Sequence, residues 1–237
     1  LAPYLSRALR ETALGVFSYA NSIAAYFVAM SMLGIARHGQ RIISENANDD
    51  IKLRKSFWSL FTVHIIVSII SLAFVVFFIK DNKTIFTIEL LYVASAIFDI
   101  TWLFYGLENF KSVVIKNALI KIFECICVFI FVKQPNDLGI YAFINATSIL
   151  IGQAIMIPQA VKAVRPIKFT KEDVRKHIKP LLVFSISVIA SFMYTVFDKT
   201  LLGIMSTKEN VAFYEYSNKI VNVPKTIIGV TGTVMFP

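Results

Sequence analysis

Residues 57–79 form an apolar stretch of 23 residues that contains no Asp, Glu, Lys or Arg. A helix rises about 1.5 Å per residue, so about 20 apolar residues are enough to cross about 30 Å of hydrocarbon. In the whole chain 57% of the residues are apolar and 16% are charged, against about 45–50% and about 25% in soluble domains. This composition argues against a soluble enzyme, a disordered tail or a nucleic-acid module, and it predicts a membrane protein.

Other windows have the length and apolarity of a membrane span, and together with the first they make seven candidates. The predicted fold class is therefore all-α, a polytopic membrane helix bundle of about seven transmembrane helices. The chain begins with Leu1 and ends inside an apolar run, so we expect a fragment of a longer protein. The windows are residues 13–35, 57–79, 85–106, 113–132, 138–160, 180–204 and 212–236.

The basic residues are divided unevenly between the two sides, as expected when Lys and Arg remain on the cytoplasmic side of the membrane. The chain has a formal net charge of +9. The connections after the first, third and fifth spans hold 13 Lys and Arg residues, and the opposite side holds six. This alternation supports the predicted spans and places residues 1–12 outside. If the intact protein starts in the cytoplasm, one further helix precedes Leu1.

The basic connection between the fifth and sixth spans contains a helix start signal. Thr170 and Asp173 have the spacing of a capping box, in which each side chain accepts from the other residue's backbone amide. We expect a short surface helix over residues 171–179 that leads into Pro180 at the start of the next span. Its basic side chains would lie against anionic lipid headgroups, at about 1 kcal/mol each, so membrane lipids are an expected partner.

Five lysines and five acidic residues fall inside the predicted spans. A charge at the centre of an inserted helix costs about 2.5–3.5 kcal/mol, whereas each Leu, Ile, Phe or Val returns about 0.3–0.6 kcal/mol. The charges either pair within the bundle, as Lys121 and Glu124 can at i, i+3, or line a polar cavity on a transport path. Because several spans share the feature, we favour the cavity. The residues are Lys116, Lys121, Lys199, Lys219 and Lys225, with Glu89, Asp99, Glu124, Asp198 and Glu215.

The sixth and seventh spans show what these charges require. Asp198 and Lys199 are adjacent in sequence and point about 100° apart on a helix, so each needs a partner on another element. Glu215 and Lys219 have the favourable i, i+4 order for an ion pair. Pro224 removes a backbone hydrogen bond, and a kink is expected there. Such features are typical of the moving parts of transporters and also of ordinary packed helices.

No catalytic constellation is recognisable, because the sequence has no HExxH motif, no phosphate-cradling Gly-rich loop and no cluster with metal-ligand spacing. Cys125 and Cys127 predict neither a disulfide framework nor a metal site. We therefore expect no enzyme activity, no cofactor and no nucleic-acid partner. A membrane-embedded glycan polymerase or glycosyltransferase is an alternative, as is a structural membrane subunit whose buried charges all pair.

Several stretches together resemble one known family. WLFYGLE (102–108) and DKTLLG (198–203) are the most specific, and PYLSRAL (3–9) and FYEYSNKIV (213–221) agree in order and spacing. They are similar to bacterial polysaccharide biosynthesis flippases of the Wzx type. The resemblance covers essentially all 237 residues, which would correspond to the N-terminal half of such a protein.

The sequence departs from the family pattern in two places. Residues 8–15, ALRETALG, replace a more usual Gly-Pro-containing turn, and residues 36–39, ARHG, replace a common aromatic-Gly pair. Elsewhere the family-like motifs contain Arg7, Asp198 and Lys199, and also Trp102, Gly106 and Glu108.

The resemblance implies a MATE-like transporter with helices in two lobes, of which residues 1–237 would form the N-terminal lobe and the start of the following helix region, without a separate soluble domain. The implied cargo is an oligosaccharide repeat unit on undecaprenyl pyrophosphate. It would be moved from the cytoplasmic to the outer leaflet of the bacterial plasma (inner) membrane for capsule, exopolysaccharide or O-antigen assembly. Polysaccharide polymerase and chain-length machinery would be partners. Within transport the alternative is a MATE-type multidrug/cation antiporter, which the lysines disfavour.

A pyrophosphate-linked sugar headgroup is large, polar and anionic, so its passage calls for a hydrated cationic cavity with alternating access between two lobes. Asp198 and Glu124 are expected to be counter-charges or ion-coupling groups. The expected cavity or mouth residues are Arg7 at the outer mouth, Lys116, Lys121, Lys199 and Lys219 in the cavity, and Tyr194 stacking on a sugar.

Overall fold

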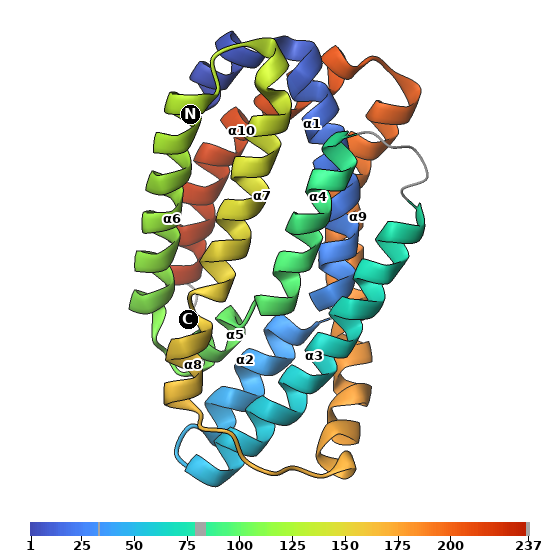
Figure 1. Cartoon of the computed structure of the whole chain (residues 1–237). Helices are drawn as coiled ribbons and strands as arrows, with labels where there is room; N and C mark the ends of the chain where they lie inside the picture. Colours follow the sequence, from blue (N-terminus) through green and yellow to red (C-terminus); the bar gives the residue numbers. More distant parts are fainter. Residues whose placement is uncertain (33, 79–83, 236–237) are drawn as a thin grey trace.

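The computed structural model describes residues 1–32, 34–78 and 84–235. Over these ranges the regular structure is helical, and no strand occurs in them. Figure 1 shows the long helices lying side by side along a common direction, with short helices at one end. The helices are α1 (Ala2–Met32), α2 (Ile35–Asn46), α3 (Asp50–Phe78), α4 (Thr84–Ser95), η1 (Ala96–Phe98), α5 (Thr101–Gly106), α6 (Phe110–Phe131), η2 (Pro135–Asp137), α7 (Leu138–Ala154), α8 (Ile157–Ala163), α9 (Lys171–Met205) and α10 (Lys208–Met235).

The all-α membrane bundle predicted from the sequence is confirmed. Within the described ranges, four helical stretches are long and apolar enough to cross a membrane: Ala2–Asn46, Asp50–Val76, Thr84–Gly106 and Pro135–Ala163. The other three predicted spans also form long helices, α6, α9 and α10. These three helices carry all five intramembrane lysines, and the number of seven spans stays a prediction.

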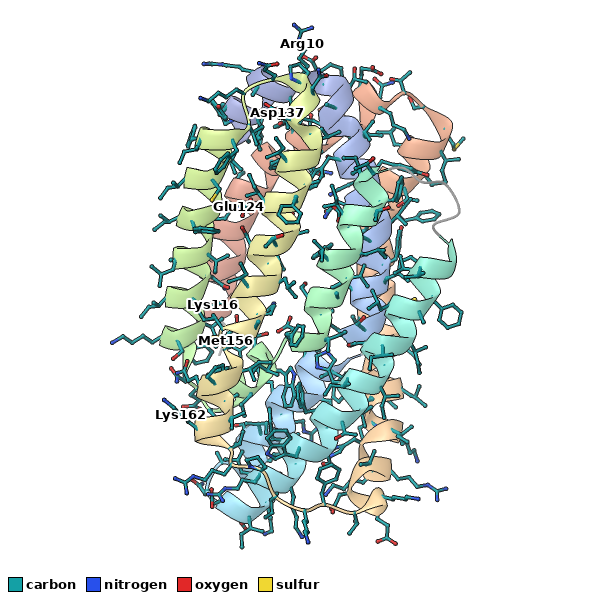
Figure 2. All side chains as sticks on the ribbon, viewed as in Figure 1. Arg10, Lys116, Glu124, Asp137, Met156 and Lys162 are labelled. Carbon is teal, nitrogen blue, oxygen red and sulfur yellow. The ribbon has the colours of Figure 1, made fainter. Side chains whose placement is uncertain are left out.

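The connections predicted to be cytoplasmic gather at one end of the bundle. Figure 1 shows α2, α8 and the start of α9 together at the lower end, whereas the loops between α6 and α7 and between α9 and α10 lie at the upper end. Figure 2 likewise shows Lys162 near one end and Arg10 at the other. The Trp58 indole nitrogen donates to the Val164 carbonyl at 3.0 Å, which fastens the chain after α8 to α3.

The largest buried cluster occupies the same lower end. Trp102 is 1% exposed and packs on Phe57 with ring centroids 5.3 Å apart. A second cluster, including Leu9, Val128 and Tyr141, joins α1 to α6 and α7. The two clusters fix the ends of the helices, so the polar residues between them are held by well-packed apolar groups.

The outer faces of α3 and α6 are apolar and exposed, as is expected for helices that contact lipid chains. On α3 the exposed side chains lie at the i, i+3, i+4 spacing of one helical face. The exposed apolar residues of these two helices include Ile66, Ile69, Ile70, Phe74, Val114, Ile115, Leu119, Ile122, Ile126 and Ile130.

Two local features of the long helices bear on the sequence predictions. The capping box at the start of α9 is confirmed, with the Asp173 amide donating to Thr170 Oγ1 at 3.3 Å and the Thr170 amide donating to Asp173 Oδ2 at 2.9 Å. The helix does not stop at residue 179; it continues through Pro180 to Met205. The prediction of a separate surface helix was therefore wrong, because this proline does not end the helix that precedes it.

Candidate functional site

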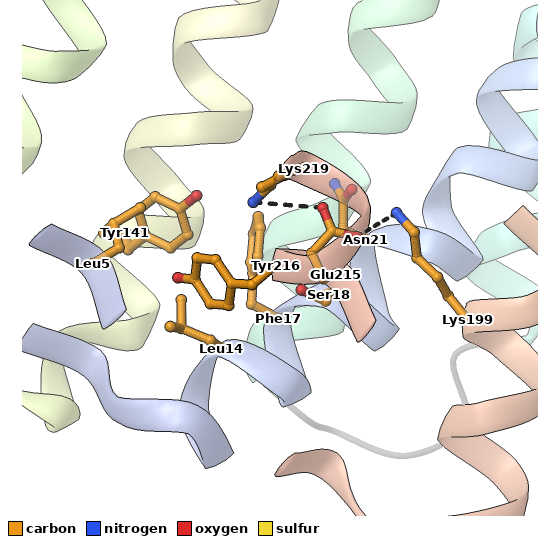
Figure 3. Close-up of a pocket in the computed structure, with 10 residues that line it drawn as sticks. All are labelled: Leu5, Leu14, Phe17, Ser18, Asn21, Tyr141, Lys199, Glu215, Tyr216 and Lys219. Atoms are coloured by element: carbon orange, nitrogen blue, oxygen red, sulfur yellow. Dashed lines mark ion pairs between the residues drawn. The ribbon is translucent and has the colours of Figure 1, made fainter. Parts of the chain in front are cut away.

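A small polar pocket, which we call the central pocket, lies inside the bundle where α1, α7, α9 and α10 meet (Figure 3). Its volume is about 40 Å³, close to the space of a single water molecule, about 30 Å³ in the liquid. The pocket is lined by Leu5, Leu14, Phe17, Ser18, Asn21, Tyr141, Lys199, Glu215, Tyr216 and Lys219.

Three charged side chains of the central pocket form one ion-pair chain. Glu215 Oε1 lies 3.4 Å from Lys219 Nζ, and Glu215 Oε2 lies 2.5 Å from Lys199 Nζ. The first pair is the i, i+4 pair expected within α10, and the second joins α10 to α9. With two ammonium groups and one carboxylate, the chain has an excess of one positive charge.

Lys199 and Lys219 differ in how far their side chains are exposed. The side chain of Lys199 is 24% exposed and that of Glu215 is 16% exposed, whereas Lys219 is 51% exposed. The Lys219 ammonium also lies 5.2 Å from the centre of the Tyr216 ring, a distance at which a cation is attracted by the face of an aromatic ring. Lys199 is thus the more enclosed of the two cations, and Lys219 is the more accessible.

A second pocket, the α6–α7 pocket, lies between those two helices and has a volume of about 250 Å³. Lys121 Nζ lies 2.9 Å from Glu124 Oε2, which confirms the predicted i, i+3 pair. Asn145 donates to the other oxygen of Glu124 at 3.2 Å. The pocket is lined by Lys116, Asn117, Ile120, Lys121, Glu124, Asn145, Ile149, Gly152 and Gln153.

Lys116 has a neutral partner in the same pocket. Its ammonium donates to Gln153 Oε1 at 3.4 Å. Lys121 is 66% exposed, whereas Glu124 is 5% exposed, so the buried carboxylate holds the lysine at the edge of the pocket. Figure 2 shows Lys116 and Glu124 along the α6 side of the bundle.

The structure therefore distributes the predicted cavity lysines between two pockets. Lys199 and Lys219 line the central pocket, and Lys116 and Lys121 line the α6–α7 pocket. The expectation of one shared cavity is corrected in this respect, because α6 and α7 present their polar residues to each other while α9 and α10 present theirs to α1. Each pocket nevertheless has the same charged composition, two lysines and one glutamate.

The remaining predicted site residues lie elsewhere. Arg7 is exposed on the first turns of α1 and does not line either pocket. Asp198 accepts a hydrogen bond from the Tyr214 hydroxyl at 2.9 Å, so it has the partner on another helix that the sequence required. The side chain of Tyr194 lies outside the described residues.

The predicted motif residues have structural positions. A Cβ on Gly106 would lie 2.6 Å from Ile43 Cβ, so this glycine lets α5 approach α2 closely. Glu108 has φ 57°, in the left-handed region that favours glycine. Trp102 is the buried centre of the lower cluster described above, and Pro224 lies inside α10.

Sequence reasoning did not single out Ser18, Asn21 or Tyr141, which are uncharged residues that line the central pocket. Asn21 and Ser18 are polar residues in an otherwise apolar span and lie at the i, i+3 spacing that puts both on one face of α1. That spacing was a usable signal. Tyr141 and Tyr216 come from helices distant in sequence, and no local pattern brings them together.

The comparisons with known proteins agree on one family. The family model described as "Polysaccharide biosynthesis protein" matches residues 1–237. A curated relative from Shigella dysenteriae, named "Putative O-antigen transporter", is 25% identical over 248 residues, which is 100% of this chain and 63% of the relative. One of the same name from Escherichia coli (strain K12) is 22% identical over 244 residues, or 99% of this chain and 59% of the relative. The chain thus spans about three fifths of these relatives. No solved structure matches it significantly.

Proposed function

The chain belongs to the polysaccharide biosynthesis protein family, and from this premise we propose that it forms part of a flippase for lipid-linked oligosaccharides. The cargo would be a repeat unit on undecaprenyl pyrophosphate, moved from the cytoplasmic to the outer leaflet of the plasma (inner) membrane. Its products would enter capsule, exopolysaccharide or O-antigen assembly. Both curated relatives are named as O-antigen transporters, which supports a transporter rather than an enzyme.

The observation that carries the proposal is the Lys199–Glu215–Lys219 chain inside an apolar bundle. Each charge placed deep in a membrane costs about 2.5–3.5 kcal/mol, and the two ammonium groups share one carboxylate. An anionic headgroup would supply the negative charge that balances the positive excess of the Lys199–Glu215–Lys219 ion pairs. A cationic drug would instead add to the positive excess, so the arrangement favours a pyrophosphate over the cargo of a multidrug antiporter.

We infer that the Glu215 carboxylate binds the two lysines in the place that the cargo phosphate would take. In the closed arrangement its two oxygens occupy the two lysines. A pyrophosphate entering the pocket would compete for both ammonium groups and release Glu215. Contacts of lysine with carboxylate and with phosphate are both charge-assisted, and a pyrophosphate has more negative charge than the single carboxylate of Glu215. The exchange would therefore be driven by the cargo's additional charge, and opening would require cargo.

The two pockets suit different parts of such a cargo. Drug-sized ligand sites enclose about 300–1,000 Å³, whereas the pockets measure about 40 Å³ and about 250 Å³. Loading therefore requires the bundle to open. The carboxamides of Asn117, Asn145 and Gln153 in the α6–α7 pocket are groups that hydrogen-bond sugar hydroxyls.

The remaining parts of the proposal follow from the family. Residues 1–237 would form the N-terminal lobe of a two-lobed transporter working by alternating access. The basic end of the bundle would face the cytoplasm. Polysaccharide polymerase and chain-length machinery would receive the flipped product.

The test is a substitution in the full-length protein. Lys199→Ala leaves Glu215 with one lysine and removes the enclosed cation, so we expect loss of surface polysaccharide in a host whose own copy of the gene is deleted. Lys199→Arg should restore part of the export. Lys133→Ala, at an exposed position outside both pockets, is the matched control and should export normally. Normal export by Lys199→Ala, at equal amounts of inserted protein, would contradict the proposal.

A further inference from the structure

Tyr141 of α7 places a phenol in the wall of the central pocket. The side chain is 7% exposed, and its ring packs on Phe17 of α1 with ring centroids 4.8 Å apart. It belongs to the buried cluster that joins α1 to α6 and α7. The ring is therefore held in place by apolar packing, so that its hydroxyl group has a set position before any ligand arrives.

The hydroxyl group of Tyr141 has no hydrogen-bond partner among the described residues. Buried polar groups in native proteins nearly always have a partner, and other tyrosines of this bundle have one. Tyr4 donates to the Val132 carbonyl at 2.7 Å, and Tyr214 donates to Asp198 at 2.9 Å. A buried hydroxyl group that lines a polar pocket and lacks a partner indicates a position where a ligand can accept a hydrogen bond.

Tyr216 of α10 contributes a second phenol to the same pocket. It interacts electrostatically with Tyr141 and with Glu215, and Figure 3 shows the rings of Tyr141 and Tyr216 next to each other. Its hydroxyl group likewise has no hydrogen-bond partner among the described residues. The centre of its ring lies 5.2 Å from the Lys219 ammonium. The two phenols thus accompany the more accessible lysine of the ion-pair chain.

Two other polar groups of the central pocket are already engaged. Asn21 donates to Glu89 Oε2 at 3.1 Å, and each carboxylate oxygen of Glu215 contacts a lysine. If cargo displaces Glu215, the two ammonium groups and the two phenols become available to it together. Phenols stay protonated at physiological pH, so they donate hydrogen bonds without adding a charge.

These four donor groups match the acceptor atoms of a pyrophosphate diester. Each of its two phosphorus atoms carries two non-bridging oxygens, whereas a phospholipid phosphodiester has one phosphorus atom and half as many. The ammonium groups supply charge-assisted bonds to two of the oxygens, and the phenols supply neutral bonds to the other two. A phosphodiester would leave donors of the pocket unpaired, and unpaired buried donors disfavour the wrong ligand.

We propose that Tyr141 and Tyr216 donate hydrogen bonds to the pyrophosphate of the cargo, and that these bonds make the central pocket prefer a pyrophosphate to a phosphodiester headgroup. This inference rests on the proposed function. The lysines attract the anion, and the phenols orient it and recognise its additional oxygens. The hydroxyl groups carry this role, whereas stacking on a sugar would require only the rings.

Binding is tested by calorimetry on the purified full-length protein in phosphatidylcholine nanodiscs, with inorganic pyrophosphate and inorganic phosphate as probes. Tyr141→Phe and Tyr216→Phe keep the rings and remove only the hydroxyl groups. We expect each to weaken pyrophosphate binding about tenfold and to reduce the preference for pyrophosphate over phosphate. Tyr105→Phe is the matched control, because Tyr105 lies outside both pockets and packs on Phe110. Wild-type affinity in both pocket variants, or no pyrophosphate binding by the wild type, would overturn the proposal.

Two further arms separate the proposal from its alternatives. In a Glu215→Gln background the effect of Tyr141→Phe should persist; if it disappears, the phenols serve Glu215 and the proposal is wrong. Phosphatidylglycerol in place of phosphatidylcholine should lower the pyrophosphate affinity of wild type and Tyr141→Phe equally, through surface charge. A larger loss in the wild type would show that the phospholipid occupies the pocket, which would overturn the selectivity.

Transport is measured in proteoliposomes with a fluorescent lipid-linked oligosaccharide. We expect Tyr141→Phe and Tyr216→Phe to need about tenfold more cargo for half-maximal flipping, and Tyr105→Phe to match the wild type. The two proposals fail differently. Tyrosine-dependent pyrophosphate binding without any flipping by the wild type overturns the flippase, whereas flipping by both pocket variants at the wild-type cargo concentration overturns the role of the tyrosines.

Discussion

We expect acidification to destabilise the lower end of the bundle through His177. This residue lies near the start of α9, ahead of the predicted span, and is 2% exposed. Its Nδ1 lies 3.0 Å from His38 Nε2, and its Nε2 lies 3.0 Å from Ser59 Oγ. The Ser59 hydroxyl donates to the Lys55 carbonyl at 2.6 Å, so His177 Nε2 is the donor to Ser59 and Nδ1 accepts from His38. The bonded network thus holds a neutral imidazole.

The magnitude follows from the pKa of His177, which is lowered from 6.5 to about 4 by burial and, less strongly, by His38 and Lys176. The unfolded chain therefore binds a proton at higher pH than the folded chain does. The stability that neutral His177 contributes is complete above about pH 6.5 and is lost as the pH falls to about 4. At about 1.4 kcal/mol per pH unit, the free energy of unfolding falls by up to about 3 kcal/mol.

The assay uses the chain's own fluorescence. It has two tryptophans, Trp58 and Trp102; Trp102 belongs to the buried cluster at this end of the bundle, and Trp58 is partly buried and packs against it. Their emission reports local opening during thermal unfolding in detergent. We expect the midpoint to fall between about pH 6.5 and about pH 4 in the wild type, and to fall less in His177→Gln, which cannot bind the proton.

Comparison of the two proteins removes the contribution of carboxyl groups that titrate in the same range. Asp173, whose pKa is lowered by the Thr170 amide and by Lys176, loses its contribution mainly at still lower pH, and it is present in both proteins. If wild type and His177→Gln lose stability equally over this pH range, the inferred tautomer network is incorrect.

Two further predictions concern backbone positions. Arg10 has φ 60° and ψ 171°, a region that is almost restricted to glycine, so Arg10→Gly should raise the free energy of unfolding by about 1 kcal/mol; an unchanged or lower value in chemical denaturation would contradict the strain. Gly106→Ala places a Cβ 2.6 Å from Ile43 Cβ and should lower the thermal midpoint, at a cost of about 1–3 kcal/mol. Gly139→Ala is its control, since a Cβ there meets nothing within 4 Å; equal midpoints for the two variants would refute the close contact.

Local sequence patterns predicted the parts of the site that lie within one helix. The pairs Lys121–Glu124 and Glu215–Lys219 form as their spacing required, because residues three or four apart on a helix are neighbours whatever surrounds them. The capping box at Thr170 formed for the same reason. The same local reasoning failed where Pro180 was expected to end a helix, since the packing of α9 decides whether it continues.

The departures from the family pattern became interpretable only in three dimensions. The segment after Arg7, where a Gly-Pro turn was expected, contains Arg10 in a conformation suited to glycine. At the second departure, His38 occupies the place of the usual aromatic residue and bonds to His177. Neither consequence is visible in sequence, because each depends on how the chain turns or on a partner 139 residues away.

The sequence by itself determined that this chain forms a membrane helix bundle, which side of it is basic and which charges pair along a helix, because apolar length, charge count and helical spacing are local quantities. Only the tertiary structure decided that Lys199 meets Glu215, that the lysines divide between two pockets, and that Asn21 meets Glu89. Those contacts join distant segments, and which faces of the helices meet is set by side-chain packing over the whole bundle.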